Sequence, residues 1–261
     1  MNILKSKEYI NEKLEIKPVT KMRLAGMHIS KPIYVIQPQS KDELLKLIME
    51  RIRDYGNVCD FNDIDVSCIT DMSGLFKSTN INCNISKWNV SNVTDMSAMF
   101  YNSTFNGDIS NWNVENVLYM ENMFSESKFN GDISKWNVGK VKNMTSMFAK
   151  SAFKGDLSKW NVGNVVTMDY MFYSSGFNSD ISKWNVGNVI DMDSMFDSSE
   201  FNGDISDWNV RNVQYMNWMF QCSNFSGDLS KWNVKNGCAH REMFLGCPIK
   251  RKRSRWPKAF R

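Results

Sequence analysis

The sequence predicts a repeat solenoid, in which short coils of the chain stack along one axis. Three ladders of residues predict it, each with a step of 24 residues and without insertion or deletion. Tryptophan recurs from Trp88 to Trp232, phenylalanine from Phe100 to Phe244 and methionine from Met99 to Met243. A weaker copy begins earlier, at Ile64. Such a period is typical of repeats that each bury one face against the next copy.

Residues 1–56 precede the regular repeats as a basic lead and a helix. The lead, residues 1–39, contains one short apolar run, Ile33–Ile36. Pro32 and Pro38 bracket this run, so we expect at most a short edge strand there.

Residues 40–55 are predicted to form an amphipathic helix. Ser40 and Glu43 have the spacing of a capping box, and Gly56 is a natural helix stop. Apolar residues follow with helical spacing at Leu44, Leu47, Ile48 and Ile52. We expect this N-terminal capping helix to cover the end of the first coil; the alternative is a helix of a separate small domain.

Residues 57–249 hold the solenoid of 24-residue repeats. Trp88 and Val90 are two residues apart, which indicates a short strand. The apolar residues of 93–100 are mostly three to four apart, which indicates short helical turns. Each coil should therefore combine a short parallel strand, a helical turn and a loop. The last copy is irregular, with Gly237 in place of valine, and a basic C-terminal tail, residues 250–261, follows it.

The regular ladders indicate structure more than binding. Buried tryptophan, phenylalanine and methionine at a fixed step would form the core. Asparagine and aspartate also recur with this step, from Asn89 to Asn233 and from Asp108 to Asp228. These side chains can bond the backbone where each coil turns a corner. Calcium binding by the aspartate ladder is the alternative, although one carboxylate per coil supplies few ligands.

Binding should depend on the positions at which the copies differ. The variable residues flank the core methionines and should line one surface. The candidate partner-binding residues are the aromatics found there: Tyr119, Tyr170, Tyr215 and Trp218. Aromatic anchors on a rigid surface favour protein binding. The alternative is that these positions are solvated and have simply drifted.

Charge is unevenly distributed along the chain. The net charge is +4, with basic ends and an acidic repeat region. The candidate anion-binding residues in the tail are Lys250, Arg251, Lys252, Arg253 and Arg255. The alternative function is therefore binding of nucleic acid or an anionic surface, with Trp256 and Phe260 available for stacking. A tail that only aids solubility is the other interpretation.

We expect no enzymatic activity, no catalytic residue, no cofactor and no metal site. The two histidines, His28 and His240, lie near opposite ends of the chain, and no nucleophile motif is recognisable. Cys222, Cys238 and Cys247 lie near His240 but lack the compact spacing of a structural zinc site.

Two further cysteines, Cys59 and Cys83, are one repeat apart and should lie on adjacent coils. Free thiols are the favoured interpretation there, and a disulfide is the alternative.

The segment from Phe105 to Phe124 reads F-N-G-D-I-S-x-W-N-V-x-N-V-x-x-M-x-x-M-F. It resembles the BspA-type leucine-rich-repeat surface proteins and, more closely, the mycoplasma-lipoprotein-type repeat family of unknown function. The resemblance covers residues 57–249 and implies a leucine-rich-repeat-like solenoid that acts in adhesion or protein binding. It supplies no catalytic residue.

The expected location follows from two separate arguments. No run of about 18 apolar residues is present to span a membrane. Residues 1–17 are polar and lack the apolar region of a secretory signal, so the default expectation is cytoplasmic. The family resemblance favours the cell surface instead.

Overall fold

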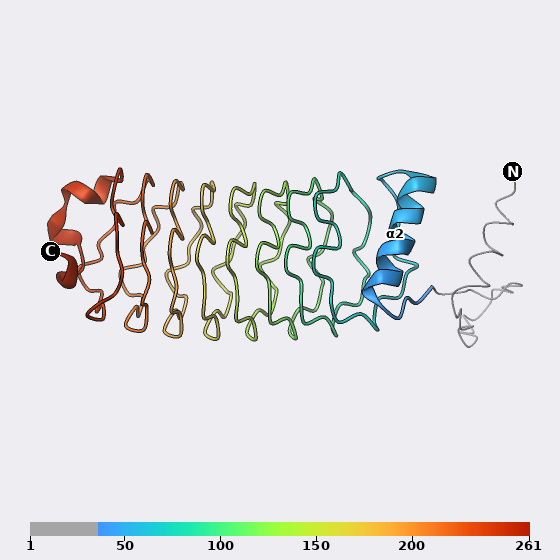
Figure 1. Ribbon diagram of the computed structural model, residues 1–261, viewed down its shortest axis with the longest axis horizontal. Helices are drawn as coiled ribbons and strands as arrows, with labels where there is room; N and C mark the ends of the chain where they lie inside the picture. Colours follow the sequence, from blue (N-terminus) through green and yellow to red (C-terminus); the bar gives the residue numbers. More distant parts are fainter. Residues whose placement is uncertain (1–35) are drawn as a thin grey trace, which may run out of the picture.

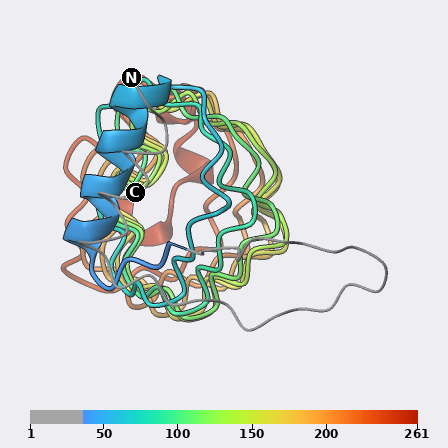
Figure 2. The same ribbon diagram turned by 90° about the vertical axis from the view of Figure 1, so that its right-hand side faces the viewer.

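The computed structural model describes residues 36–261, which form a row of coils stacked along one axis (Figure 1). The helix α2 (Lys41–Tyr55) lies at one end of the row and the C-terminus at the other. Seen along the axis, successive coils lie over one another (Figure 2). The edge strand predicted at 33–36 falls outside the described residues except for Ile36, which makes a single parallel bridge with Ile64.

Backbone hydrogen bonds join each coil to the next at a constant offset. Parallel bridges link residues 24 apart in one series: Asp71, Asp95, Tyr119, Asn143, Thr167, Asp191, Tyr215 and Ala239. After each bridge, alternate N–H groups donate to the following coil, as in the 2.7 Å bond from Ala98 to the Glu121 carbonyl. The N–H groups between them close turns within the coil, as in the 3.2 Å bond from Met99 to the Met96 carbonyl. Buried peptide groups thereby find partners without a helix or a wide sheet.

The strand and helix expected within each coil are not what the structure contains. In the second coil a single bridge lies at Asp95, rather than a strand at 88–90, and turns occupy residues 97–102. Ala98 and Asn102 have left-handed backbone, with φ of 54° and 49°. This conformation directs alternate peptide groups along the stack and prevents a continuous helix. Three-residue turns place side chains inward at nearly helical spacing, which explains the misleading pattern.

The interior is filled by the three predicted ladders, all of whose members are buried in one continuous core. Equivalent rings stack from coil to coil, with centroids 5.6 Å apart for Phe100 and Phe124 and 6.5 Å apart for Trp112 and Trp136. Each ladder tryptophan also donates its indole N–H to the preceding coil, as in the 3.1 Å bond from Trp136 to the Ile109 carbonyl. The buried indoles therefore carry no unsatisfied donor.

The corners of the coils are held by the asparagine and aspartate ladders. Asp156 accepts the Ser158 N–H at 2.8 Å, and Asn137 accepts the Gly139 N–H at 3.2 Å. Equivalent bonds recur along both ladders. The prediction that these side chains serve the backbone is confirmed at these positions.

The helix predicted after Ser40 is present as α2. The Ser40 hydroxyl accepts the Glu43 N–H at 3.2 Å, while the Glu43 carboxylate accepts the N–H of Gln39 at 2.8 Å, one residue before the partner of an ordinary capping box. Gly56, with φ of 82°, ends the helix. The buried side chains of α2 share the core with the first coil: Leu44, Leu47 and Ile48.

The C-terminal segment packs against the last coil as three short 3₁₀ helices: η1 (Pro248–Arg251), η2 (Arg253–Arg255) and η3 (Lys258–Phe260). The ring of Trp256 lies 4.8 Å from that of Phe244, and the ring of Phe260 stacks 3.9 Å from that of His240. The sequence of residues 250–261 has no apolar period and therefore predicts a tail that does not pack on the stack. These two aromatic residues, the buried Ile249 and the 2.8 Å bond from the Leu229 N–H to the Arg255 carbonyl hold the segment on the stack.

Candidate functional site

The variable residues of each coil form one surface, here called the turn face. It consists of a five-residue segment from each coil, at residues 70–74, 94–98, 118–122, 142–146, 166–170, 190–194, 214–218 and 238–242. Each segment contains the bridge residue, an inward methionine (replaced by the exposed His240 in the last coil) and a left-handed residue. The inward side chain is fixed by the core, so the others determine what the face presents.

The backbone of the turn face tolerates different side chains at the bridge position. Where that residue is acidic or an amide, its side-chain oxygen accepts the N–H two residues further on, at 2.7–2.9 Å: Asp71, Asp95, Asn143 and Asp191. Tyr119, Thr167 and Tyr215 occupy the same position and make the same bridges. The local fold therefore does not require a particular residue at the bridge position, so the side chain there can vary with the partner that is bound.

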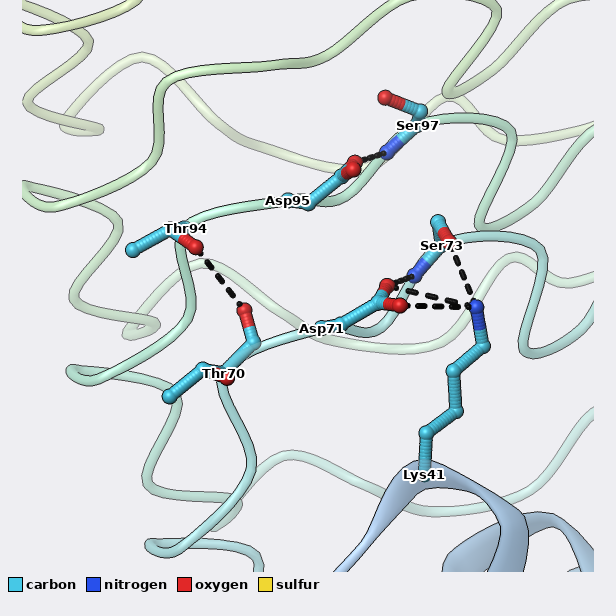
Figure 3. A network of polar contacts seen from close by, with 7 residues as sticks. All are labelled: Lys41, Thr70, Asp71, Ser73, Thr94, Asp95 and Ser97. Carbon is cyan, nitrogen blue, oxygen red and sulfur yellow. Dashed lines mark hydrogen bonds and ion pairs between the residues drawn. The ribbon is translucent and has the colours of Figure 1, made fainter.

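The N-terminal end of the turn face is closed by α2 (Figure 3). Lys41 of the helix reaches the Asp71 carboxylate at 3.3 Å and the Ser73 hydroxyl at 2.5 Å. In the next coil Asp95 repeats the turn and accepts the Ser97 N–H at 2.8 Å (Figure 3), and within residues 36–261 it forms no ion pair. The open part of the face therefore begins at the second coil.

Three of the four predicted aromatics are exposed on the turn face, with Tyr119 at 44%, Tyr170 at 39% and Tyr215 at 45%. Tyr119 and Tyr215 share the bridge position four coils apart, which corresponds to about 19 Å. Tyr170 lies between them at a left-handed position, with φ of 56°. The structure thus places these three side chains in a row rather than in a cluster.

The fourth aromatic, Trp218, is already occupied by contacts within the chain. Its indole N–H donates to the Glu242 carboxylate at 3.1 Å, and the Arg241 guanidinium lies 5.7 Å from the ring centroid. The side chain is half-buried. A partner would have to compete with these contacts, so Trp218 is the weakest of the four candidates.

Between Tyr170 and Tyr215 the turn face is acidic. Asp169, Asp191 and Asp193 lie on adjacent coils and are half-buried. Burial raises the pKa of Asp191, and repulsion from Asp193 and Asp169 adds to the rise. Asp169 accepts the Thr145 hydroxyl at 2.6 Å. The sequence predicts only the aromatics as binding residues, because these three aspartates occupy variable positions and follow no period.

A shallow depression of about 220 Å³ lies beside Tyr215. Its border includes Val213, Lys235 and Gly237. Gly237 occupies the ladder position at which the preceding coil has Val213, so the missing side chain leaves the hollow. The volume is below that of a typical small-molecule pocket, but it suits a single side chain of a partner.

The predicted anion-binding residues lie on the C-terminal segment. Lys250, Arg251, Lys252 and Arg253 are exposed. Arg255 is half-buried and donates to the Ser226 carbonyl at 2.7 Å, so it holds the segment in place. The Arg253 guanidinium lies 5.5 Å from the centroid of the Trp256 ring, so the segment has four exposed cationic groups and one structural arginine.

The remaining candidates from the sequence are the two histidines. His28 lies outside the described residues, and His240 stacks on Phe260. Within residues 36–261, no three His, Cys, Asp or Glu side chains are arranged to hold a metal ion, and no helix is long and apolar enough to cross a membrane. Along the ladder from Asp108 to Asp228, hydrogen bonds from backbone N–H groups lower the pKa of the carboxyls, which fits a structural role.

The coils and their variable face define a repeat protein. A family model described as a Mycoplasma protein of unknown function, DUF285, matches residues 48–156 and again residues 149–256. The chain therefore belongs to this family. No curated protein and no solved structure matches the sequence significantly.

Proposed function

We propose that this protein is a non-enzymatic protein-interaction scaffold, a leucine-rich-repeat-like solenoid whose turn face binds a macromolecular partner. The observation that supports this most strongly is that the turn face keeps one backbone while its side chains change. The likeness to BspA-type surface proteins extends the proposal to adhesion at the cell surface.

The chemistry of the turn face indicates what kind of partner it suits. Tyr170 and Tyr215 flank the acidic group of Asp169, Asp191 and Asp193. Tyrosine offers a large apolar surface with little conformational entropy to lose, and carboxylates select for cationic groups. The proposed partner is a protein that presents basic and apolar side chains together.

A triple variant tests this proposal: Tyr119→Ser, Tyr170→Ser and Tyr215→Ser. A matched control changes three exposed apolar residues near the N-terminal end: Met49→Ser, Tyr55→Ser and Val58→Ser. Proteins retained by the immobilised chain are quantified by mass spectrometry, and their direct affinity is then measured with purified material. We expect the turn-face variant to lose at least tenfold in affinity while the control binds as the parent does. Equal affinity of parent and triple variant would refute the proposal.

The second candidate is binding of nucleic acid or another anionic surface by the C-terminal segment. The specific observation that favours it is that packing of Trp256 and Arg255 holds four exposed cationic side chains at one end of the stack. Removing residues 250–261 would also uncover the last coil, so substitution is the cleaner test. Lys250, Arg251, Lys252 and Arg253 are changed to glutamine, and binding to single-stranded DNA and anionic vesicles is measured against salt concentration. Loss of a salt-dependent affinity supports this candidate, and unchanged affinity contradicts it.

A further inference from the structure

Two cysteines of adjacent coils lie in direct contact near the N-terminal end of the stack. The Sγ atoms of Cys59 and Cys83 are 3.3 Å apart, and both thiols are free. The backbone holds them in register, because the Asn84 N–H donates to the Cys59 carbonyl at 2.8 Å. Neighbouring bridged chains are about 4.8 Å apart, which lies within the Cα separation of about 4.4–6.8 Å that disulfides span.

The later coils show that a preceding phenylalanine crowds this position, although one of them, with Phe177, has Ser179 there. The equivalent position is glycine in most of them, and a Cβ added at Gly107 or Gly131 would lie 2.9 Å from the ring of Phe105 or Phe129. The residue two positions earlier is phenylalanine in those coils, whereas Asn57 and Ile81 precede the two cysteines. Without the ring, the space beside the backbone accepts a thiol in two consecutive coils.

We propose that Cys59 and Cys83 form a redox-active dithiol that a small-molecule disulfide, such as oxidised glutathione, converts to a disulfide. The Cys59 thiolate attacks one sulfur of the oxidant and forms a mixed disulfide, which releases one small thiol. Cys83 then loses its proton and attacks the Cys59 sulfur, which releases the second thiol. Two protein thiols and one small disulfide become one protein disulfide and two small thiols.

The surroundings assign different roles to the two cysteines. Cys59 is partly exposed and follows the exposed Val58, so the oxidant can reach it. Cys83 is buried, and burial, with a further contribution from its contact with Cys59, raises the pKa of its thiol to about 12. Cys59 is therefore the attacking thiol and Cys83 the resolving thiol, which acts only once a mixed disulfide lies within reach.

The disulfide would fasten the connection between α2 and the coils. Cys59 follows the helix end at Gly56, and the bond would tie this segment to the second coil. It would close a 24-residue loop, which limits the freedom of the opened chain. The effect should be confined to residues 57–85 because each coil contacts only its neighbours.

The test uses the full chain with its two exposed cysteines removed by Cys68→Ser and Cys222→Ser. After incubation with oxidised glutathione, the denatured mass should fall by two hydrogens without a glutathione adduct, and peptide mapping should find Cys59 joined to Cys83. Adding Cys83→Ser should stop the reaction at a glutathione adduct on Cys59. Adding Cys59→Ser instead should slow all reaction at Cys83 at least tenfold.

Serine is a sound replacement because Ser179 occupies the equivalent position in a later coil. Hydrogen exchange provides the second measurement: oxidation should slow exchange in residues 57–85 and leave residues 105–230 unchanged. A stable glutathione adduct on Cys59 in the presence of Cys83, no reaction at either cysteine, or unchanged exchange after oxidation would each overturn the proposal.

Discussion

The interior of the stack and its turn face follow opposite rules within the same coils. Inside, the same residue type returns every 24 residues, and each ladder phenylalanine ring stacks on its own copy in the next coil. On the turn face, aspartate, tyrosine, asparagine and threonine share one position and make the same bridge. Regularity therefore indicates which side chains the fold requires, and irregularity indicates which side chains are free for binding.

The largest difference in stability between the two regions should appear when one aromatic ring is removed from each. Phe148 is fully buried and stacks on Phe124 and Phe172 at 5.8 Å, so Phe148→Ala leaves a cavity between three coils. We expect it to lower the free energy of unfolding by about 3–5 kcal/mol. Tyr119→Ala removes an exposed ring and should cost less than about 1 kcal/mol. Urea unfolding followed by circular dichroism measures both, and similar losses would show that the turn face is also part of the packed structure.

A smaller effect is expected from adding one methyl group at two glycines. At Gly131 the new Cβ would meet the Phe129 ring at 2.9 Å, and that ring is locked in the core. Gly131→Ala should destabilise the protein by about 1–3 kcal/mol. At Gly176 the Cβ meets only the flexible ends of Lys154 and Glu200, and an earlier coil has Ala152 at that position. Gly176→Ala should therefore be neutral or slightly stabilising. Thermal unfolding of the two variants measures the difference. An equal loss of stability in both would mean that the backbone conformation, and not the contact with the ring, determines the destabilisation.

The sequence predicts those parts of the molecule that are periodic. The core ladders can be predicted because rings stack on their own copies. Helix α2 can be predicted because Ser40 and the leucine spacing obey general helix rules. The position of the bridge at Asp95 cannot be predicted from the sequence. Turns of three residues imitate helical spacing, and the left-handed conformation is adopted by residues as different as Ala98 and Tyr170.

The site is predictable only in outline. The exposed tyrosines could be named because the variable positions follow from the period. The occupation of Trp218 by Glu242 could not, since that bond depends on how two adjacent coils face each other. The closure of the last coil by Trp256 and Phe260 could not be predicted either, because both residues lie outside the repeat.

The smallest expected effect is on the free energy of unfolding when one of two carboxyls is replaced. The change should have opposite signs for the two carboxyls. The hydrogen bond from the Ser158 N–H lowers the pKa of Asp156 on the regular ladder, whereas burial raises that of Asp191 on the turn face. A lowered pKa adds stability above the unfolded value, and this stability is lost as pH falls through the folded value. A raised pKa costs stability above the folded value, and the cost disappears as pH falls below the unfolded value.

At pH 7 Asp156→Asn should therefore lower the stability and Asp191→Asn should raise it. Both changes should stay within about 0.5 kcal/mol, as is usual outside the core. Both should shrink toward zero in acid, where the parent carboxyls are protonated and resemble the amides. Urea unfolding between pH 3 and 7 measures the difference. If Asp191→Asn instead destabilises the protein at pH 7, the charge at Asp191 supports the fold, and the freedom inferred for the turn face does not extend to its acidic centre.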